Sequence, residues 1–250
     1  MKVTLLQTDI FWAQPARNVE AAEEAIRKAP KSDLYILPEM WSTGFATVPE
    51  GIAESDESES LEWMKSAADR FNAAIAGSIA IKSGNDGTYR NRFYFVKPGG
   101  EVSFYDKHHL FTYGGEHRRY TAGKERVTVE WRGVRFLLIV CYDLRFPLWA
   151  RSREDYDAIL CVASWPTPRV NAWRTLLKAR AIENQFYVAG VNRVGSDPSC
   201  EYCGGTAFID PYGNADECPD NTVSFVTGEI DMERLEAFRQ KFPVLKDRDL

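Results

Sequence analysis

Residues 136–147 read Phe136-Leu137-Leu138-Ile139-Val140-Cys141-Tyr142-Asp143-Leu144-Arg145-Phe146-Pro147. The apolar, partly β-branched run predicts a buried strand that ends at Val140. Polar and charged residues follow at once, and ligands bind beyond strand ends in sheets that helices cover. A thiol at this point, Cys141, is open on one side and suits a nucleophile. A small buried core thiol is the alternative, because free cysteines are mostly interior. This stretch alone does not decide between them.

The bulk composition is that of an ordinary globular protein. A net charge of −5 and a pI near 5.4 argue against nucleic acid or an anionic membrane as the main partner. No apolar run approaches the ~18 residues that span a bilayer. The N-terminus, Met1 to Asp9, turns polar too soon for a signal peptide. We therefore expect a cytoplasmic protein.

Five cysteines, an odd number, fit a reducing compartment better than a disulfide framework. Cys200, Cys203 and Cys218 could suggest zinc, but no second pair or nearby histidine completes a tetrahedral set. We interpret them as loop thiols and expect neither a metal nor a cofactor. A thiol-based metal or redox module remains the alternative from a different class of protein.

Strands and helices alternate at both ends of the sequence, whereas hairpins occupy its middle. The helices are predicted over residues 15–28, 61–71, 169–184 and 232–241. The acidic run from Glu54 to Glu59 is interpreted as a solvated loop leading into the second helix. This order favours an α/β fold with two mixed sheets and helices on their outer faces. Without a linker, repeat or low-complexity segment, residues 1–250 are predicted to form a single domain.

Two further predicted strands also end on residues that can do chemistry. Leu34 to Leu37 leads to Glu39, and Val102 to Tyr105 leads to Lys107. Only sheets whose strand ends share an edge could bring these residues to Cys141. Taken alone, Glu39 could be a solvated loop carboxylate, which is what most glutamates are.

The contexts of these residues resemble the nitrilase superfamily, the carbon–nitrogen hydrolases with a Glu-Lys-Cys triad. The matching segments are 37–40, 105–111 and 140–147, supported by 44–45, 91–92, 120–123, 178–184 and 210–213. The resemblance implies a four-layer α-β-β-α sandwich, usually doubled by dimerisation. Gly115-Glu116-His117 and Trp165-Pro166 look closest to the ω-amidase branch. Those enzymes hydrolyse the side-chain amide of 2-oxoglutaramate or 2-oxosuccinamate to ammonia and a dicarboxylic keto acid.

The resemblance also implies a role for each site residue. Cys141 would attack the amide carbonyl and form a thioester. Glu39 would accept the thiol proton, pass it to departing ammonia and then activate water. Lys107 would stabilise the oxyanion with a backbone N–H that we assign to Tyr142. Glu116 resembles a second glutamate that positions Lys107 and substrate, although a salt bridge to a loop arginine is its alternative. The residue types leave the resting protonation state of Cys141 open.

An ω-amide of this kind also carries a carboxylate, which needs a cation or several N–H donors. Arg145 is the candidate, although it could instead pair with Asp143 and brace the loop. Trp165 could form a wall of the pocket or belong to the core. N-carbamoyl amines, aliphatic amides and nitriles remain alternative substrates of the same triad. A Cys-His hydrolase, with one of the three histidines as base, is the rival mechanism.

Overall fold

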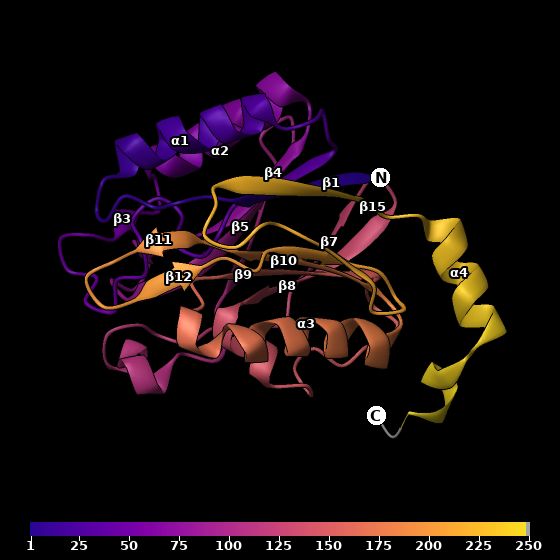
Figure 1. Ribbon diagram of the computed structural model, residues 1–250. Coiled ribbons are helices and arrows are strands. Elements are labelled where there is room, and N and C mark those ends of the chain that lie inside the picture. The colour runs from indigo at the N-terminus through magenta and orange to yellow at the C-terminus, as the bar shows by residue number, and fades with distance from the viewer. Residues whose placement is uncertain (249–250) are drawn as a thin grey trace.

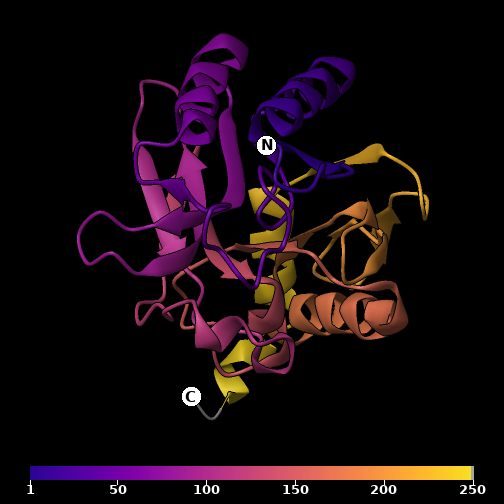
Figure 2. The same cartoon turned by 90° about the vertical axis from the view of Figure 1, so that its left-hand side faces the viewer.

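Two β-sheets packed face to face form the centre of the computed structural model, which describes residues 1–248 (Figures 1 and 2). Helices α1 (Pro15–Lys28) and α2 (Glu59–Phe71) cover the outer face of the first sheet. Helix α3 (Val170–Asn184) covers the outer face of the second. Helix α4 (Met232–Lys241) lies at one end of the sandwich. The predicted α-β-β-α layers are confirmed, and each helix begins within two residues of its predicted start.

Both sheets are mixed, as predicted. The first has the order β15-β1-β2-β4-β5-β6, with β3 beside β4. Its strands are β1 (Lys2–Gln7), β2 (Leu34–Ile36), β3 (Glu54–Ser55), β4 (Ala74–Lys82), β5 (Tyr89–Val96), β6 (Val102–Asp106) and β15 (Ser224–Glu229). The second has the order β14-β13-β10-β9-β8-β7. Its strands are β7 (Thr128–Trp131), β8 (Val134–Val140), β9 (Ala158–Ala163), β10 (Tyr187–Asn192), β13 (Ala207–Ile209) and β14 (Ala215–Glu217).

Strand β8 is buried on both faces, which explains its continuous apolar sequence. Phe136 and Leu138 point into the core between the sheets, and Phe136 packs on Phe95 of the first sheet with ring centres 6.0 Å apart. Leu137 and Ile139 point the other way and pack beneath α3. Alternate residues of one strand thus serve two cores.

Two interpretations of the sequence are wrong at the level of elements. Glu54 and Ser55 form strand β3 beside β4, and the Glu54 carboxylate accepts a hydrogen bond from the Ser42 hydroxyl. The acidic run is therefore not wholly a solvated loop. A hairpin of β11 (Val194–Ser196) and β12 (Glu201–Cys203) was also missed. Cys203 is buried in this hairpin, so it is not a loop thiol.

Chain direction explains where the functional residues lie. Strands β8, β9 and β10 are parallel, so their carboxyl ends share one edge of the second sheet. In the first sheet β2 is parallel to β4. Strand β6 runs in the same direction, because β5 is antiparallel to both β4 and β6. The carboxyl ends of β2 and β6 therefore also share an edge.

Candidate active site

The two sheets meet at the edge where these strands end. Glu39 follows β2, Lys107 follows β6 and Cys141 follows β8. One carboxylate oxygen of Glu39, Oε2, accepts a hydrogen bond of 2.8 Å from the backbone N–H of Ser164, the residue after β9. A side chain from the first sheet is thereby tied to the backbone of the second.

Lys107 lies between two carboxylates. Its Nζ is 2.9 Å from Oε1 of Glu39 and 3.0 Å from Oε2 of Glu116. All three side chains are fully buried. The alternative for Glu116, a salt bridge with a loop arginine, is not what the structure contains: Arg119 pairs with Glu50 instead.

Asn91, at the start of β5, joins the same cluster. Its Nδ2 donates to Oε1 of Glu39 at 2.7 Å and to Oε1 of Glu116 at 3.1 Å. In the sequence Asn91 is only part of a matching segment, and no role was predicted for it. Its position in a strand that pairs with β6, whose end carries Lys107, was the available signal.

Burial and neighbouring charges set the protonation of this cluster. Burial opposes the charge on Lys107, but Glu116 and Glu39 outweigh it and hold the Lys107 pKa well above its ordinary value. Burial, together with the negative charge of Glu39, raises the pKa of Glu116 despite the nearby ammonium. Burial and Glu39 likewise raise the pKa of the Cys141 thiol well above its ordinary value, and Lys107 compensates only in part. Cys141 therefore rests as a neutral thiol.

The backbone turns sharply at Cys141, whose φ of 48° is in the left-handed region. The short 3₁₀ helix η3 (Cys141–Arg145) starts there, and Asp143 within it is fully buried. The Asp143 carboxylate accepts hydrogen bonds from Val140 N at 2.9 Å, His109 N at 2.8 Å and the Tyr105 hydroxyl at 2.8 Å. These contacts fasten the Cys141 turn to the segment that carries Lys107.

The histidines have other surroundings. The ring of His109 stacks on Phe146 and binds Asp143 through Nδ1, and the ring of His108 stacks on Trp149. His117 is exposed. Within residues 1–248 none of them lines the cavity that contains Cys141.

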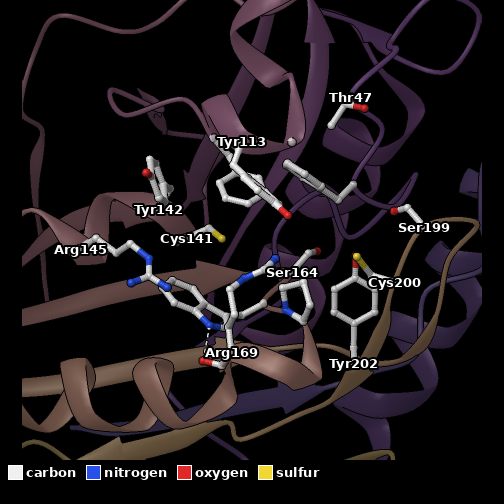
Figure 3. Close-up of a pocket in the computed structure, with 15 residues that line it drawn as sticks. Thr47, Tyr113, Cys141, Tyr142, Arg145, Ser164, Arg169, Ser199, Cys200 and Tyr202 are labelled. Carbon is white, nitrogen blue, oxygen red and sulfur yellow. Dashed lines mark hydrogen bonds between the residues drawn. The ribbon is translucent and has the colours of Figure 1, made fainter.

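A cavity of about 210 Å³ opens beside Cys141 (Figure 3). It is smaller than the ~300 Å³ at which pockets for drug-sized ligands begin, so it suits a small molecule. Its lining comprises Phe45, Thr47, Phe111, Tyr113, Gly114, Cys141, Tyr142, Arg145, Ser164, Trp165, Pro166, Arg169, Ser199, Cys200 and Tyr202. Phe45 also contacts the buried cluster, since Lys107 Nζ lies 5.3 Å from its ring centre.

Both substrate-binding candidates line this cavity. Arg145 stacks over the ring of Trp165, with 4.8 Å between its Cζ and the ring centre. It does not pair with Asp143, whose acceptor positions are taken by other donors. Arg169 and the residues Ser199, Cys200 and Tyr202 of the β11–β12 hairpin also line the cavity. They were not predicted, because nothing in the sequence placed them at this edge.

Of the thiols considered for a metal, Cys200 lines the cavity and Cys203 and Cys218 are buried. Across the described part of the chain, residues 1–248, no group of three or more His, Cys, Asp or Glu side chains is arranged to hold a metal ion. No helix within those residues is both long and apolar enough to cross a membrane.

A buried Glu-Lys pair beside a cysteine, at the edge of an α-β-β-α sandwich, defines a class of hydrolases. Comparison with known families agrees: the carbon-nitrogen hydrolase family matches residues 2–240. The chain belongs to this family, within the nitrilase superfamily, and is a carbon–nitrogen hydrolase that acts on amides.

Among its relatives, omega-amidase YafV of Escherichia coli (strain K12) is 45% identical over 100% of this chain and 97% of the relative. The 2-oxoglutaramate amidase of Bacillus subtilis (strain 168) is 36% identical over 98% of this chain and 96% of the relative. A similar solved structure is XC1258 from Xanthomonas campestris, a CN-hydrolase superfamily protein with an arsenic adduct in its active site. It is 40% identical, with a TM-score of 0.96 over 100% of this chain and 97% of that one.

Proposed function

We propose that this enzyme hydrolyses the ω-amide of a 2-oxo dicarboxylic acid monoamide, 2-oxoglutaramate or 2-oxosuccinamate, to ammonia and the dicarboxylic keto acid. The observation that carries the proposal is the fully buried Glu39–Lys107–Glu116 cluster at the edge where Cys141 meets a small cavity. The names of the relatives, omega-amidase and 2-oxoglutaramate amidase, support the substrate.

The first step begins from the neutral thiol. Because the pKa of Cys141 is raised, sulfur must lose its proton as it attacks the amide carbonyl. Glu39 accepts that proton, since it is buried beside the thiol and its negative charge acts on it. A sulfur–carbon bond forms and the carbonyl oxygen becomes an oxyanion.

Two groups stabilise this oxyanion in the proposal. Lys107 supplies a fixed positive charge that its carboxylate neighbours keep protonated. The backbone N–H of Tyr142 supplies a donor, because it lies in the first turn of η3, where amides have no intrahelical acceptor.

Collapse of the tetrahedral intermediate breaks the carbon–nitrogen bond. Glu39 returns the proton to the departing nitrogen, so ammonia leaves and the acyl group remains on sulfur as a thioester. Water then enters, Glu39 takes its proton, and the oxygen of the water attacks the thioester carbonyl. The carbon–sulfur bond breaks to release the acid, and Glu39 returns the proton to sulfur and restores the thiol. Glu116 does not take part directly; it holds the Lys107 ammonium in place together with Glu39.

The substrate carboxylate binds Arg145 in this proposal, and Trp165 forms the wall beside it. The guanidinium is stacked on the indole ring, which restricts its motion and leaves its N–H donors for an anion. Trp165 is only 3% exposed, so the wall is rigidly packed.

The test is ammonia release from 2-oxoglutaramate, glutamine, N-carbamoyl-β-alanine and a simple nitrile, with Cys141→Ala as the control. We expect fast release from 2-oxoglutaramate and none from the variant. Release from another compound of the panel alone would overturn the substrate and keep the triad. Full activity of Cys141→Ala, checked for a retained fold by circular dichroism, would overturn the mechanism.

We further propose a cytoplasmic homodimer or higher homo-oligomer in which residues 1–250 form a single domain. The absence of disulfides among the described cysteines, all five of which are free, supports a reducing compartment. An apolar surface patch supports dimerisation: Ile182 of α3, Tyr212 and Phe242 are each more than half exposed, and Phe238 of α4 packs 4.1 Å from the Tyr212 ring. Sedimentation velocity of the wild type and of Phe242→Asp tests this, and a wild type that is monomeric at micromolar concentration would contradict it.

A further inference from the structure

The cavity beside Cys141 carries an unbalanced positive charge. Arg145 and Arg169 both line it, and within residues 1–248 no aspartate or glutamate is part of the lining. Neither guanidinium forms an ion pair with a carboxylate of that part of the chain; each instead lies over an aromatic ring, Trp165 for Arg145 and Phe111 for Arg169. Figure 3 shows both arginines around the same space as the Cys141 sulfur.

The backbone that carries Arg169 is firmly held. Pro166 and Pro168 restrict the turn η4 (Thr167–Arg169), and the Trp165 indole N–H donates to the Arg169 carbonyl at 2.8 Å (dashed in Figure 3). The backbone of Trp165 is itself fixed by hydrogen bonds of 2.7 and 3.0 Å to the Asn192 side chain. One indole therefore positions both arginines, because its ring supports Arg145 and its N–H binds the residue that carries the second guanidinium.

Two uncompensated guanidiniums discriminate between kinds of amide. A 2-oxo acid end presents three oxygen acceptors, two from the carboxylate and one from the adjacent carbonyl, which two planar donor groups can share. An amino acid end carries an ammonium next to its carboxylate, and that cation would be repelled by both arginines without a carboxylate to receive it.

We propose that Arg169, together with Arg145, selects ω-amides whose far end is an anion with no accompanying cation. 2-Oxo acid amides are thereby preferred over the corresponding amino acid amides. This inference rests on the proposed amide hydrolysis at Cys141 and adds a residue that determines its specificity.

The kinetic test compares three five-carbon amides that differ only at the far end: 2-oxoglutaramate, glutamine and pentanamide. In Arg169→Met, kcat/KM for 2-oxoglutaramate should fall by about 10- to 100-fold, mainly through KM, as expected for the loss of a charge-assisted hydrogen bond. The value for pentanamide should change less than twofold. Arg169→Lys should restore part of the loss, because it keeps the charge without the planar fork.

Arg17→Met is the matched control, because Arg17 also lies over an aromatic ring, that of Phe11, but is not part of the cavity lining. This variant should have the wild-type kcat/KM for all three substrates. An equal loss on 2-oxoglutaramate and pentanamide in Arg169→Met would overturn the proposal, since a loss of local structure would affect both alike.

A binding measurement separates this inference from the proposed function. Calorimetry with Cys141→Ala should detect 2-oxoglutarate binding that is at least tenfold tighter than glutamate binding and that is lost when Arg169→Met is added. That result would uphold the selection rule even if no ω-amide were hydrolysed. Equal affinity for the two diacids would overturn it even if 2-oxoglutaramate were a substrate.

Discussion

Cys141 combines an unusual backbone conformation with a thiol whose pKa is raised. Its φ of 48° directs the residue out of the line of β8, and such a conformation persists only where the surrounding structure holds it. Its thiol is neutral because burial and Glu39 both disfavour the thiolate. In the proposed mechanism the thiol therefore becomes nucleophilic only as Glu39 accepts its proton during attack on the substrate.

This protonation state predicts how alkylation of Cys141 depends on pH. In the wild type, the rate with iodoacetamide should still be rising above pH 9, because the folded pKa lies well above the ordinary value. Glu39→Gln removes the neighbouring negative charge, so the rise should shift to lower pH. Mass spectrometry of peptides, in a Cys200→Ser background, would restrict the signal to Cys141. A wild-type rate that is already level at pH 7 would contradict the neutral thiol.

Lys107 is expected to contribute mainly to the reaction step. In the proposed mechanism, Lys107→Met removes one oxyanion partner, a change that typically costs about 10²–10³ in kcat. Steady-state kinetics on 2-oxoglutaramate would measure it, with circular dichroism to check folding. A loss of less than tenfold would mean that backbone donors stabilise the oxyanion almost alone.

At the scale of elements, η3 and the segment after β6 behave as one unit. Asp143 accepts hydrogen bonds from both segments, and Gly123 donates its N–H to the Lys107 carbonyl at 2.9 Å. A Cβ at Gly123 would lie 2.1 Å from the Asp106 carbonyl oxygen. Cys141 and Lys107 are therefore held at a fixed relative position, because Asp143 joins the segments that carry them.

Asp143→Asn should disturb this unit without touching substrate. The amide group of asparagine cannot accept on its NH₂ side, so at least one of the donors loses its acceptor at a cost of about 1–3 kcal/mol. Urea denaturation should show this loss, and kcat should fall more than KM rises. Asp155→Asn, which alters a partly exposed pair with Arg126, is the control and should lose less. Unchanged stability and kcat would contradict the positioning role.

At the scale of the molecule, a charged cluster lies at the edge of the interface between the sheets. Lys107 balances two buried carboxylates, and Ser164 N–H and Asn91 complete their hydrogen bonds. Removing one partner of such a cluster leaves uncompensated charge in the interior, which typically costs 3–5 kcal/mol.

Lys107→Met should therefore make stability depend on pH. Without the ammonium, burial and the negative charge of Glu39 hold the pKa of Glu116 in the folded state above its unfolded value of about 4.3. Stability is then fully present below the unfolded pKa and is lost as pH rises through the folded pKa. Urea denaturation should show a deficit against wild type that is larger at pH 8 than at pH 5. Adding Glu116→Gln to Lys107→Met should restore part of the stability that is lost at pH 8. A double variant that is no more stable at pH 8 than Lys107→Met would contradict this explanation.

Much of the fold and of the site follows from local patterns in the sequence. Continuous apolar strands such as 134–140 and helices with one apolar face predicted the layers. A strand buried on both faces has a continuous apolar run, whereas a helix buried on one face has apolar residues at helical spacing. The motifs around Glu39, Lys107 and Cys141 predicted the family and the residues that the two sheets bring to one edge. These features are local, so they can be recognised in the linear chain.

The surroundings of those residues depend on contacts that form only in the folded chain. Asn91 bridges two carboxylates, Glu116 faces Lys107 rather than a loop arginine, and Arg169 lines the cavity with the missed hairpin β11–β12. Each of these facts depends on contacts between segments far apart in the chain. Hydrogen bonds and charge effects act over a few ångströms, and only the packing of the two sheets sets which groups come that close.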